Sequence, residues 1–166
     1  MPELLPSERL RPCLLDRLTD EAPHRRKEGR DPRVMTLSRY RQAVLRDLAW
    51  LLNTSNRDSI DDIGEFEEIE TSVLNYGIPD LCGRQVSSLA PEEISQRISK
   101  AIHWCEPRIV ASTLEVTPIS NPDSMTGNAL SFEITGELWA QPFNEVLFIK
   151  TDVDLETGEF TIEEES

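Results

Sequence analysis

Apolar residues recur at every third or fourth position in two stretches of the chain, residues 37–52 and residues 91–105. This spacing places them on one face of an α-helix. Thr36 or Ser38 can accept a hydrogen bond from an unpaired amide in the first turn of the first helix. Pro91 suits the first helical position of the second helix, where no amide is needed. The pattern therefore predicts two long amphipathic helices.

The second half of the chain alternates apolar and polar residues with a period of two. In residues 129–140, for example, one polar residue, Glu133, separates Phe132 from Ile134. This alternation is typical of a strand with one solvated face. Further strands are expected near residues 109–118, 145–153 and 159–163, with turns at residues 121–123, 141–142 and 156–158. The predicted fold class is α+β, with two main helices packed on an antiparallel sheet of about four strands in a single domain.

Residues 1–36 have a different composition, because they hold five of the eleven prolines and the basic stretch 24–30. Within them, Leu14, Leu15 and Leu18 share one face of a short helix expected at about residues 12–19. We interpret residues 1–36 as an N-terminal extension with a docking helix and a solvated basic linker, and residues 37–166 as the domain. The alternative for the basic stretch is a patch that binds an acidic partner.

Two segments lie between the predicted helices. Residues 58–70 are acidic, with isoleucine and phenylalanine at every third position, which predicts a short helix or 3₁₀ segment. In residues 72–81, turn-forming residues separate apolar ones, so this segment is expected to be a turn ordered by packing on the core. The apolar residues expected to pack there are Val73, Leu74, Tyr76, Ile78 and Leu81.

The charge is unevenly distributed and limits the possible partners. The formal net charge is −14, and residues 58–166 hold 5 Lys and Arg against 23 Asp and Glu, so binding of nucleic acid by the domain is excluded. No apolar run is long enough to cross a membrane, and the first residues lack the pattern of a signal peptide. We therefore expect a cytoplasmic protein without direct membrane insertion.

Candidate catalytic and metal-binding residues are few. Cys13, Cys82 and Cys105 are odd in number and far apart, which argues against a disulfide framework and a CxxC zinc site. His24 and His103 belong to no Ser-His-Asp or HExxH pattern. We expect no catalytic residue, no metal and no cofactor. The acidic segment also lacks the glycine-containing loop of a calcium site.

The triplet Glu106-Pro107-Arg108 stands where the second helix must end, because a proline disfavours the helical conformation of the residue before it. Arg108 can make two parallel hydrogen bonds to a carboxylate, and Glu106 can hold it or bind a cation of a partner. Two interpretations remain open. The triplet locks the helix to the sheet, or it contacts a partner. On the first helix, Arg39, Arg41 and Arg46 are interpreted as a solvated face.

Four motifs in this order resemble one known family. They are LLDRL at residues 14–18, VLRDLAWLLNT at residues 44–54, SVLNYGIPD at residues 72–80 and EPRI at residues 106–109. The chain resembles, over roughly residues 10–160, the TssE family of type VI secretion baseplate subunits. These belong to the phage baseplate-wedge family once labelled lysozyme-like. The resemblance implies a structural component of a contractile injection machine, located in the cytoplasm at the membrane-docked baseplate.

The resemblance also implies partners. Glu106, Pro107 and Arg108 would contact the helical core bundle of the wedge, formed by TssF and TssG in a wedge that also contains TssK. The C-terminal strands, at about residues 147–153 and 159–162, would offer an edge to the first TssB/TssC sheath ring and so initiate sheath polymerisation. The residues expected at this sheath contact are Leu147, Ile149, Thr151, Val153, Phe160 and Ile162.

One alternative function stays open at this point. Paired carboxylates such as Glu68 and Glu70 could act as acid and base in glycoside hydrolysis. The chain would then be a lysozyme-like hydrolase that cleaves peptidoglycan. Such an enzyme needs two carboxylates that face each other across a cleft, and a cleft is not visible in a sequence.

Overall fold

The computed structural model describes residues 10, 12–19, 24, 35–57, 66–82, 90–119, 129–140 and 144–164. Its α-helices are α1 (Leu14–Leu18), α2 (Leu37–Leu52), α3 (Glu67–Glu70) and α4 (Pro91–Cys105). Two 3₁₀ turns, η4 (Val73–Asn75) and η6 (Ala111–Thr113), accompany them. The strands are β1 (Glu115–Ile119), β2 (Ala129–Leu138), β3 (Glu145–Asp154) and β4 (Phe160–Glu164). The described residues thus form the α+β fold that the sequence predicts.

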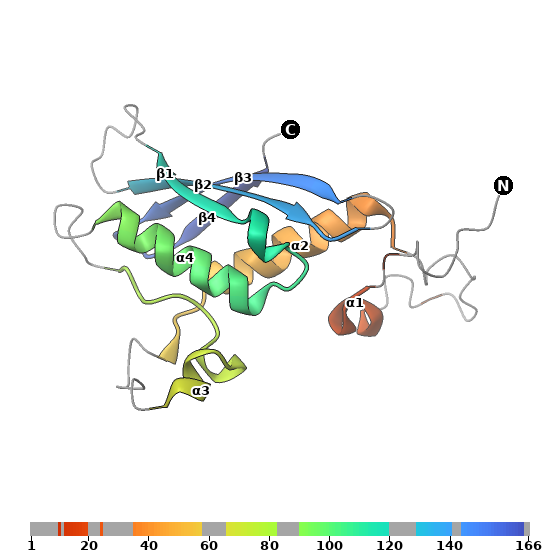
Figure 1. Cartoon of the computed structure of the whole chain (residues 1–166), viewed down its shortest axis with the longest axis horizontal. Helices are drawn as coiled ribbons and strands as arrows, with labels where there is room; N and C mark the ends of the chain where they lie inside the picture. Colours follow the sequence, from red (N-terminus) through yellow and green to blue (C-terminus); the bar gives the residue numbers. More distant parts are fainter. Residues whose placement is uncertain are drawn as a thin grey trace.

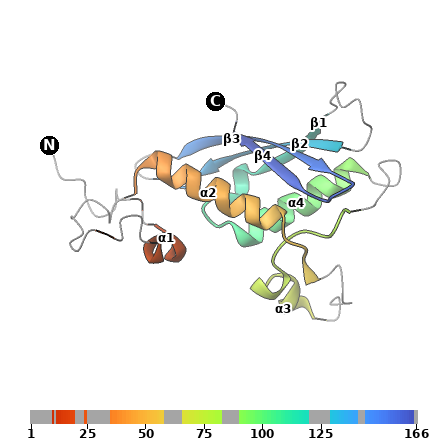
Figure 2. The same cartoon turned by 180° about the vertical axis from the view of Figure 1, so that it is seen from behind.

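The strands form one antiparallel sheet in the order β1-β2-β3-β4. Figures 1 and 2 show α2 and α4 on the same side of this sheet, with α4 beneath β1 and β2 and α2 nearer β4. The segment containing α3 and η4 lies below the two long helices (Figure 1). The fold is therefore a layer of two helices on a layer of sheet, with β1 and β4 at the sheet edges.

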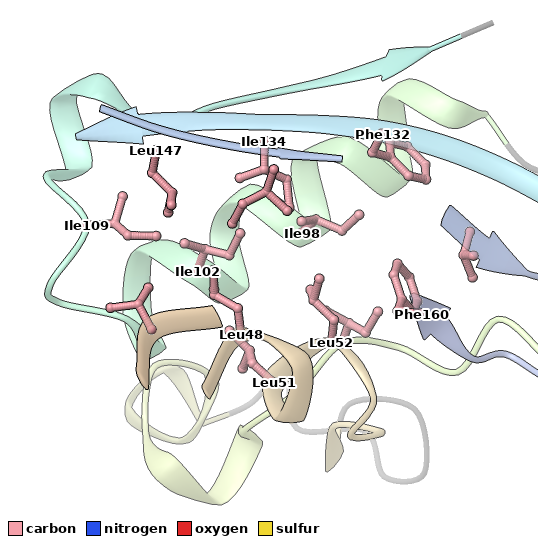
Figure 3. Packing of buried hydrophobic residues seen from close by; sticks show 14 of the residues in the cluster. Leu48, Leu51, Leu52, Ile98, Ile102, Ile109, Phe132, Ile134, Leu147 and Phe160 are labelled. Atoms are coloured by element: carbon pink, nitrogen blue, oxygen red, sulfur yellow. The ribbon is translucent and has the colours of Figure 1, made fainter. Parts of the chain in front are cut away.

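The core lies between these two layers. Helix α2 begins after Thr36, whose side chain accepts a hydrogen bond from the Arg39 amide at 3.3 Å. Both long helices turn their predicted apolar faces to the sheet, and burial of this apolar surface is the main stabilising term of the fold. Figure 3 shows the residues that meet there, among them Leu48, Leu51, Leu52, Ile98, Ile102, Ile109, Phe132, Ile134, Leu147 and Phe160.

Strand β2 follows the predicted alternation with one exception. Phe132, Ile134 and Leu138 are buried against the helices, as expected. Ser131, predicted on the solvated face, is also buried, and its hydroxyl donates to Asp152 directly across the strand pair. This side-chain hydrogen bond replaces the water that the hydroxyl would otherwise bind.

The first predicted strand is wrong over its first half. Ile109 makes only an isolated antiparallel bridge with Leu138, and η6 follows before β1 begins at Glu115. The reason lies in Thr113. Its hydroxyl accepts a hydrogen bond from the Glu137 amide at 2.9 Å, so a side chain takes the place that a ladder bond would occupy.

The segment of residues 72–81 agrees with the prediction only in part. Ile78 and Leu81 are buried, but Val73 and Leu74 are 86% and 68% exposed, so the predicted packing of these two residues on the core is wrong. The hydroxyl of Ser72 accepts a hydrogen bond from the Leu74 amide at 3.2 Å. This local bond favours a 3₁₀ turn that directs both side chains outward.

Gly77 fixes the path of the same segment. Its φ is +114°, and a Cβ at this position would lie 2.1 Å from the carbonyl oxygen of Thr54. The close approach allows a short parallel bridge between Ser55 and Ile78, in which the Ile78 amide donates to the Thr54 oxygen at 2.9 Å. Only glycine combines this backbone angle with this spacing.

Several predictions fall outside the described residues. They concern the basic linker apart from His24, residues 58–65 of the acidic segment, and the turns at 121–123 and 141–142. The division into an extension of residues 1–36 and a domain of residues 37–166 stays a prediction. The predicted turn at 156–158 is present, and Gly158 supplies its positive φ of 75°.

Candidate functional site

The Glu106-Pro107-Arg108 triplet forms the turn between α4 and the sheet. The Glu106 amide donates to the Ile102 oxygen at 2.8 Å and ends the helix, and the Ile109 amide donates to the Glu106 oxygen at 3.2 Å. On the sheet side, the Trp139 amide donates to the Arg108 oxygen at 2.8 Å. The turn is thus attached through its backbone to the helix and to the end of β2.

The side chains of the triplet pair within the domain. Arg108 Nε donates to Glu106 Oε1 at 2.6 Å, and its Nη2 contacts the second oxygen of Glu106 and donates to Asp47 Oδ2 at 2.6 Å. Glu106 is only 4% exposed, and the side chain of Arg108 is 18% exposed. Arg108 therefore faces its own domain, whereas Pro107 is exposed.

The pairing continues along α2 to the N-terminal helix. Arg46 Nε donates to Asp47 Oδ1 at 2.8 Å, and Arg46 Nη1 donates to Asp16 Oδ1 at 2.8 Å. The same guanidinium lies 5.1 Å from the centre of the Trp50 ring, within the range of a cation–π contact. We call Glu106, Arg108, Asp47, Arg46 and Asp16 the ion-pair chain. It joins α1, α2 and the turn after α4.

These contacts correct the interpretation of Arg41 and Arg46 as part of a solvated face, whereas Arg39 is exposed as predicted. Arg46 belongs to the ion-pair chain. Arg41 contacts Glu145 at 3.0 Å and also pairs with Glu164, so it holds the start of β3 and the end of β4. Its side chain is only a quarter exposed. The helical period could not distinguish these positions from truly solvated ones, because their partners are distant in sequence.

The charges along the chain shift the titration of its members. Burial alone would lower the pKa of Arg108, but hydrogen bonds from its guanidinium and the charges of Glu106 and Asp47 raise it above its ordinary value. Burial alone would raise the pKa of Asp16, but hydrogen bonds from Cys13 and Arg46 and the Arg46 charge hold it below 3.8. Both groups are therefore charged in the folded protein near neutral pH.

The structure leaves the predicted wedge contact of the triplet untested. Because Glu106 is buried, a partner that reached this turn would meet Pro107 and the outer side of Arg108 first. The predicted docking role of Leu14, Leu15 and Leu18 is also untested. These side chains are 69%, 41% and 73% exposed, so the polar side of α1 faces α2 and its apolar side faces away.

The residues predicted at the sheath contact lie in the last two strands, and most point into the core. Leu147, Ile149, Thr151, Val153 and Phe160 are buried, and Ile162 is half-buried. Strand β3 lies between β2 and β4, whereas β4 stands at the sheet edge. A strand from another molecule would therefore meet the backbone of β4, whereas most of these six side chains face the core.

The hydrogen-bond pattern shows which backbone groups of β4 point outward. The Asp154 amide donates to the Glu159 oxygen at 3.0 Å, so Asp154 and Glu159 form a hydrogen-bonded pair. In an antiparallel ladder, backbone groups alternate between the two sides of a strand. The amides and carbonyls of Phe160, Ile162 and Glu164 consequently point away from β3, and the described part of the chain places no strand on that side.

The opposite edge of the sheet is formed by β1, which contains Pro118 opposite Phe132. Proline has no amide to donate, so it weakens any pairing with a further strand. Of the two sheet edges, the one formed by β4 is therefore better suited to receive a strand.

The carboxylates considered for glycoside hydrolysis are not brought together. Glu70 lines a groove of about 280 Å³ between α3 and α4, where its Oε1 pairs with Lys100. Glu68 does not line this groove. Residues two positions apart on a helix point to different sides, so a facing pair of these two carboxylates is not formed.

Cys13, Cys82 and Cys105 carry free thiols. Within the described ranges, no three His, Cys, Asp or Glu side chains are grouped as they would be around a metal ion. None of the helices in these ranges is long and apolar enough to cross a membrane.

Three residues important to these surfaces bind partners that are distant in the sequence. Asp47 binds Arg108 across 61 positions, Asp16 binds Arg46 across 30, and Asn53 binds Phe160 across 107. A polar residue on the border of an apolar helix face, as Asp47 is, can signal a buried pair but does not identify its partner. No signal in the sequence indicated that Asn53 binds Phe160.

The family described as baseplate wedge protein gp25 matches residues 38–143. No curated protein matches the chain. A crystal structure described as a putative tail lysozyme from Geobacter sulfurreducens is 17% identical, with a TM-score of 0.41, and covers 70% of this chain and 94% of that chain. This structural similarity is too low to support an inference about activity.

The family match spans more than half of the chain and lies across α2, α4 and the first strands of the sheet. It includes the Glu106-Pro107-Arg108 turn and most of the ion-pair chain. The protein belongs to the baseplate wedge protein gp25 family, which also contains TssE, and its role is that of a structural baseplate component.

Proposed function

We propose that this protein is the TssE-type baseplate subunit of a type VI secretion machine. It attaches to the TssF/TssG wedge, in an assembly that contains TssK, and initiates the TssB/TssC sheath by offering a β-strand edge. Its place is cytoplasmic, at the membrane-docked baseplate. Family membership supports the baseplate role, and the exposed edge of β4 is the observation that carries the sheath role.

The physical basis of the sheath role is the edge of β4. An unpaired strand edge presents amides and carbonyls that another strand can bind. In the described residues, β4 offers such groups at Ile162 and Glu164, and the side chains of Thr161 and Glu163 are exposed beside them. The first sheath ring lacks a neighbour on its baseplate side, and this edge supplies one.

A single substitution tests this role. Ile162→Pro removes an amide that points outward, so the β3–β4 ladder keeps its hydrogen bonds while the incoming strand loses one. With purified wedge, TssB and TssC, we expect at least about a tenfold drop in sheaths counted by electron microscopy. Ile162→Ala is the matched control, because it loses more side-chain packing but retains the amide. Normal sheath numbers with Ile162→Pro would contradict the sheath role.

The wedge contact is tested at Pro107, which is exposed and takes no part in the ion pairs. Pro107→Glu places a charge on the turn without breaking the Glu106–Arg108 pair. We expect loss of co-purification with TssF and TssG at unchanged circular dichroism. Ser112→Glu, at an exposed position in η6, is the control and should bind normally. Equal binding of Pro107→Glu and Ser112→Glu to TssF and TssG would show that the turn is not part of the interface.

We also propose that the protein has no hydrolytic activity. The pairing of Glu70 with Lys100 and the absence of Glu68 from the groove support this proposal. No clearing is expected when the purified protein is run in a gel that contains peptidoglycan. Clearing that disappears with Glu70→Gln would restore the lysozyme-like alternative.

A further inference from the structure

Asn53 imitates a neighbouring strand at the beginning of β4. Its Nδ2 donates to the Phe160 oxygen at 3.0 Å, and its Oδ1 accepts from the Phe160 amide at 2.9 Å. These two bonds are the pair that a residue of an added antiparallel strand would make. Asn53 follows the last residue of α2, and its Nδ2 also donates to the Ala49 oxygen at 2.9 Å, which fixes the carboxamide.

The edge of β4 is consequently divided into two parts. The outward groups of Phe160 are already bound by Asn53, whereas those of Ile162 and Glu164 face a side on which the described residues place no strand. A strand that pairs with β4 can use the second part and must end where Asn53 begins. The register of the added strand is thereby fixed by a side chain of α2.

A groove continues the line of this edge beyond Asn53. It has a volume of about 420 Å³ and lies between the end of α2, the segment around Ile78 and the turn before β4. Among the described residues, the charged ones that line it are Asp80 and Glu159, both acidic, and no described Lys or Arg lines it. A long cationic side chain fits such a groove by charge.

The strands beside the groove are acidic as well. Between residues 145 and 164 there are seven Asp and Glu against one basic residue, Lys150. A second copy of this chain would bring the same negative charge to the edge, and like charges across a strand pair are unfavourable. The charge therefore selects a different and basic partner.

We propose that the edge of β4 and the adjoining groove form one binding site for an extended segment rich in Lys or Arg. The segment pairs with Ile162 and Glu164, ends at Asn53 and places a cationic side chain between Asp80 and Glu159. This inference rests on the proposed strand addition to β4. Beyond that role, it specifies that the added strand is basic and that Asn53 sets its register.

The charge part is tested with two probes on the complete chain. One is an end-blocked hexapeptide of alternating threonine and lysine, and the other has glutamate in place of lysine. We expect the lysine peptide to shift the amide resonances of Ile162 and Glu164 and to bind at least about tenfold more tightly, with weaker binding at higher salt. Equal affinity of the two peptides, or shifts confined to β1, would overturn the proposal.

Variants locate the cationic side chain. Asp80→Asn combined with Glu159→Gln should weaken binding of the lysine peptide at least about fivefold, since the groove loses both charges. The lysine peptide should also slow alkylation of the exposed Cys82, another lining residue. Unchanged affinity of the double variant together with unchanged alkylation would show that no cationic side chain enters the groove.

Hydrogen exchange tests the role of Asn53. In the parent protein, the Phe160 amide should be protected without peptide. In Asn53→Ala the Phe160 amide should be unprotected without peptide. It should become protected when the lysine peptide binds, because the added strand can then also pair with Phe160. Protection of Phe160 that does not change in Asn53→Ala would overturn the register assignment. Should this variant not fold, the Asp80 and Glu159 variants still test the charge.

Strand addition to β4 and the preference for a basic segment are tested separately. Normal sheath growth with Ile162→Pro would show that strand addition to β4 is wrong. If Ile162→Pro blocks sheath growth while the lysine and glutamate peptides bind equally, strand addition stands and the preference for a basic segment is wrong.

Discussion

Replacement of Arg108 by alanine should destabilise the protein strongly, because the substitution leaves Glu106 buried without its cation. In the folded state, Glu106 is 4% exposed and receives hydrogen bonds from the Arg108 side chain and, at 3.1 Å, from the Arg108 amide. Only the amide bond would survive the substitution. Asp47 would lose Arg108 but would keep Arg46 as its partner.

The size of the effect follows from this difference. Removal of one partner of a buried ion pair costs about 3–5 kcal/mol. Arg108 and Asp47 are partly exposed, at 18% and 22%, so water can reach one end of the cluster. We therefore expect a loss of about 2–4 kcal/mol, against a total stability of about 5–15 kcal/mol for a domain. Arg108→Glu should lose at least as much stability, because it places a further carboxylate beside those of Glu106 and Asp47.

Urea denaturation followed by circular dichroism measures this loss as a shift of the midpoint at constant slope. Arg97→Ala is the control, because Arg97 forms an exposed pair with Glu93 on α4, with side chains 42% and 61% exposed. It should cost no more than about 0.5 kcal/mol. A loss below about 1 kcal/mol for Arg108→Ala, or an equal loss for the control, would refute the buried-pair argument. Recovery of part of the stability by Glu106→Gln in the Arg108→Ala background would support it.

Three further outcomes are expected. The folded pKa of Asp16 is lowered, so its pair with Arg46 is intact above about pH 3.8 and is lost as the pH falls through the lowered value; NMR shifts of α1 that change between pH 5 and 7 instead would contradict this. Gly77→Ala should cost at least about 2 kcal/mol in a thermal melt, because of its positive φ and the clash with the Thr54 oxygen, and a neutral result would argue against this backbone geometry. Burial raises the pKa of the Cys105 thiol, so iodoacetamide should label exposed Cys82 first at pH 8, as read by peptide mass spectrometry; equal rates would contradict the assignment.

Sequence patterns were reliable where the determining contacts are periodic and local. The bounds of α2 and α4 follow from apolar spacing, from the cap at Thr36 and from the prolines at positions 91 and 107. The same holds for β2 and β3, whose side chains alternate between the core and the outer face. Turn geometry was less predictable, because Ser72 and Thr113 form side-chain hydrogen bonds that redirect the backbone.

The candidate sites depend on contacts that have no period. The triplet could be recognised as a helix end, but whether Arg108 faces inward depends on Asp47, which lies 61 positions earlier. Asn53 binds the outward groups of Phe160 at the start of β4, and these two residues lie 107 positions apart in the sequence. Charge pairs and side-chain caps between distant segments arise from the tertiary arrangement, so the sequence alone could not assign them.

Helix α2 connects the two candidate surfaces. Near its middle, Asp47 binds the Arg108 turn; at its ends, Arg41 pairs with Glu164 and Asn53 binds Phe160, so the helix holds both ends of β4. Asp47 and Asn53 are six residues apart, about 9 Å along the helix axis, and share no partner. Contacts at such a distance act on stability almost independently. Helix α2 therefore acts as a rigid spacer that sets the distance between the proposed wedge contact at one surface and the proposed strand addition at the other.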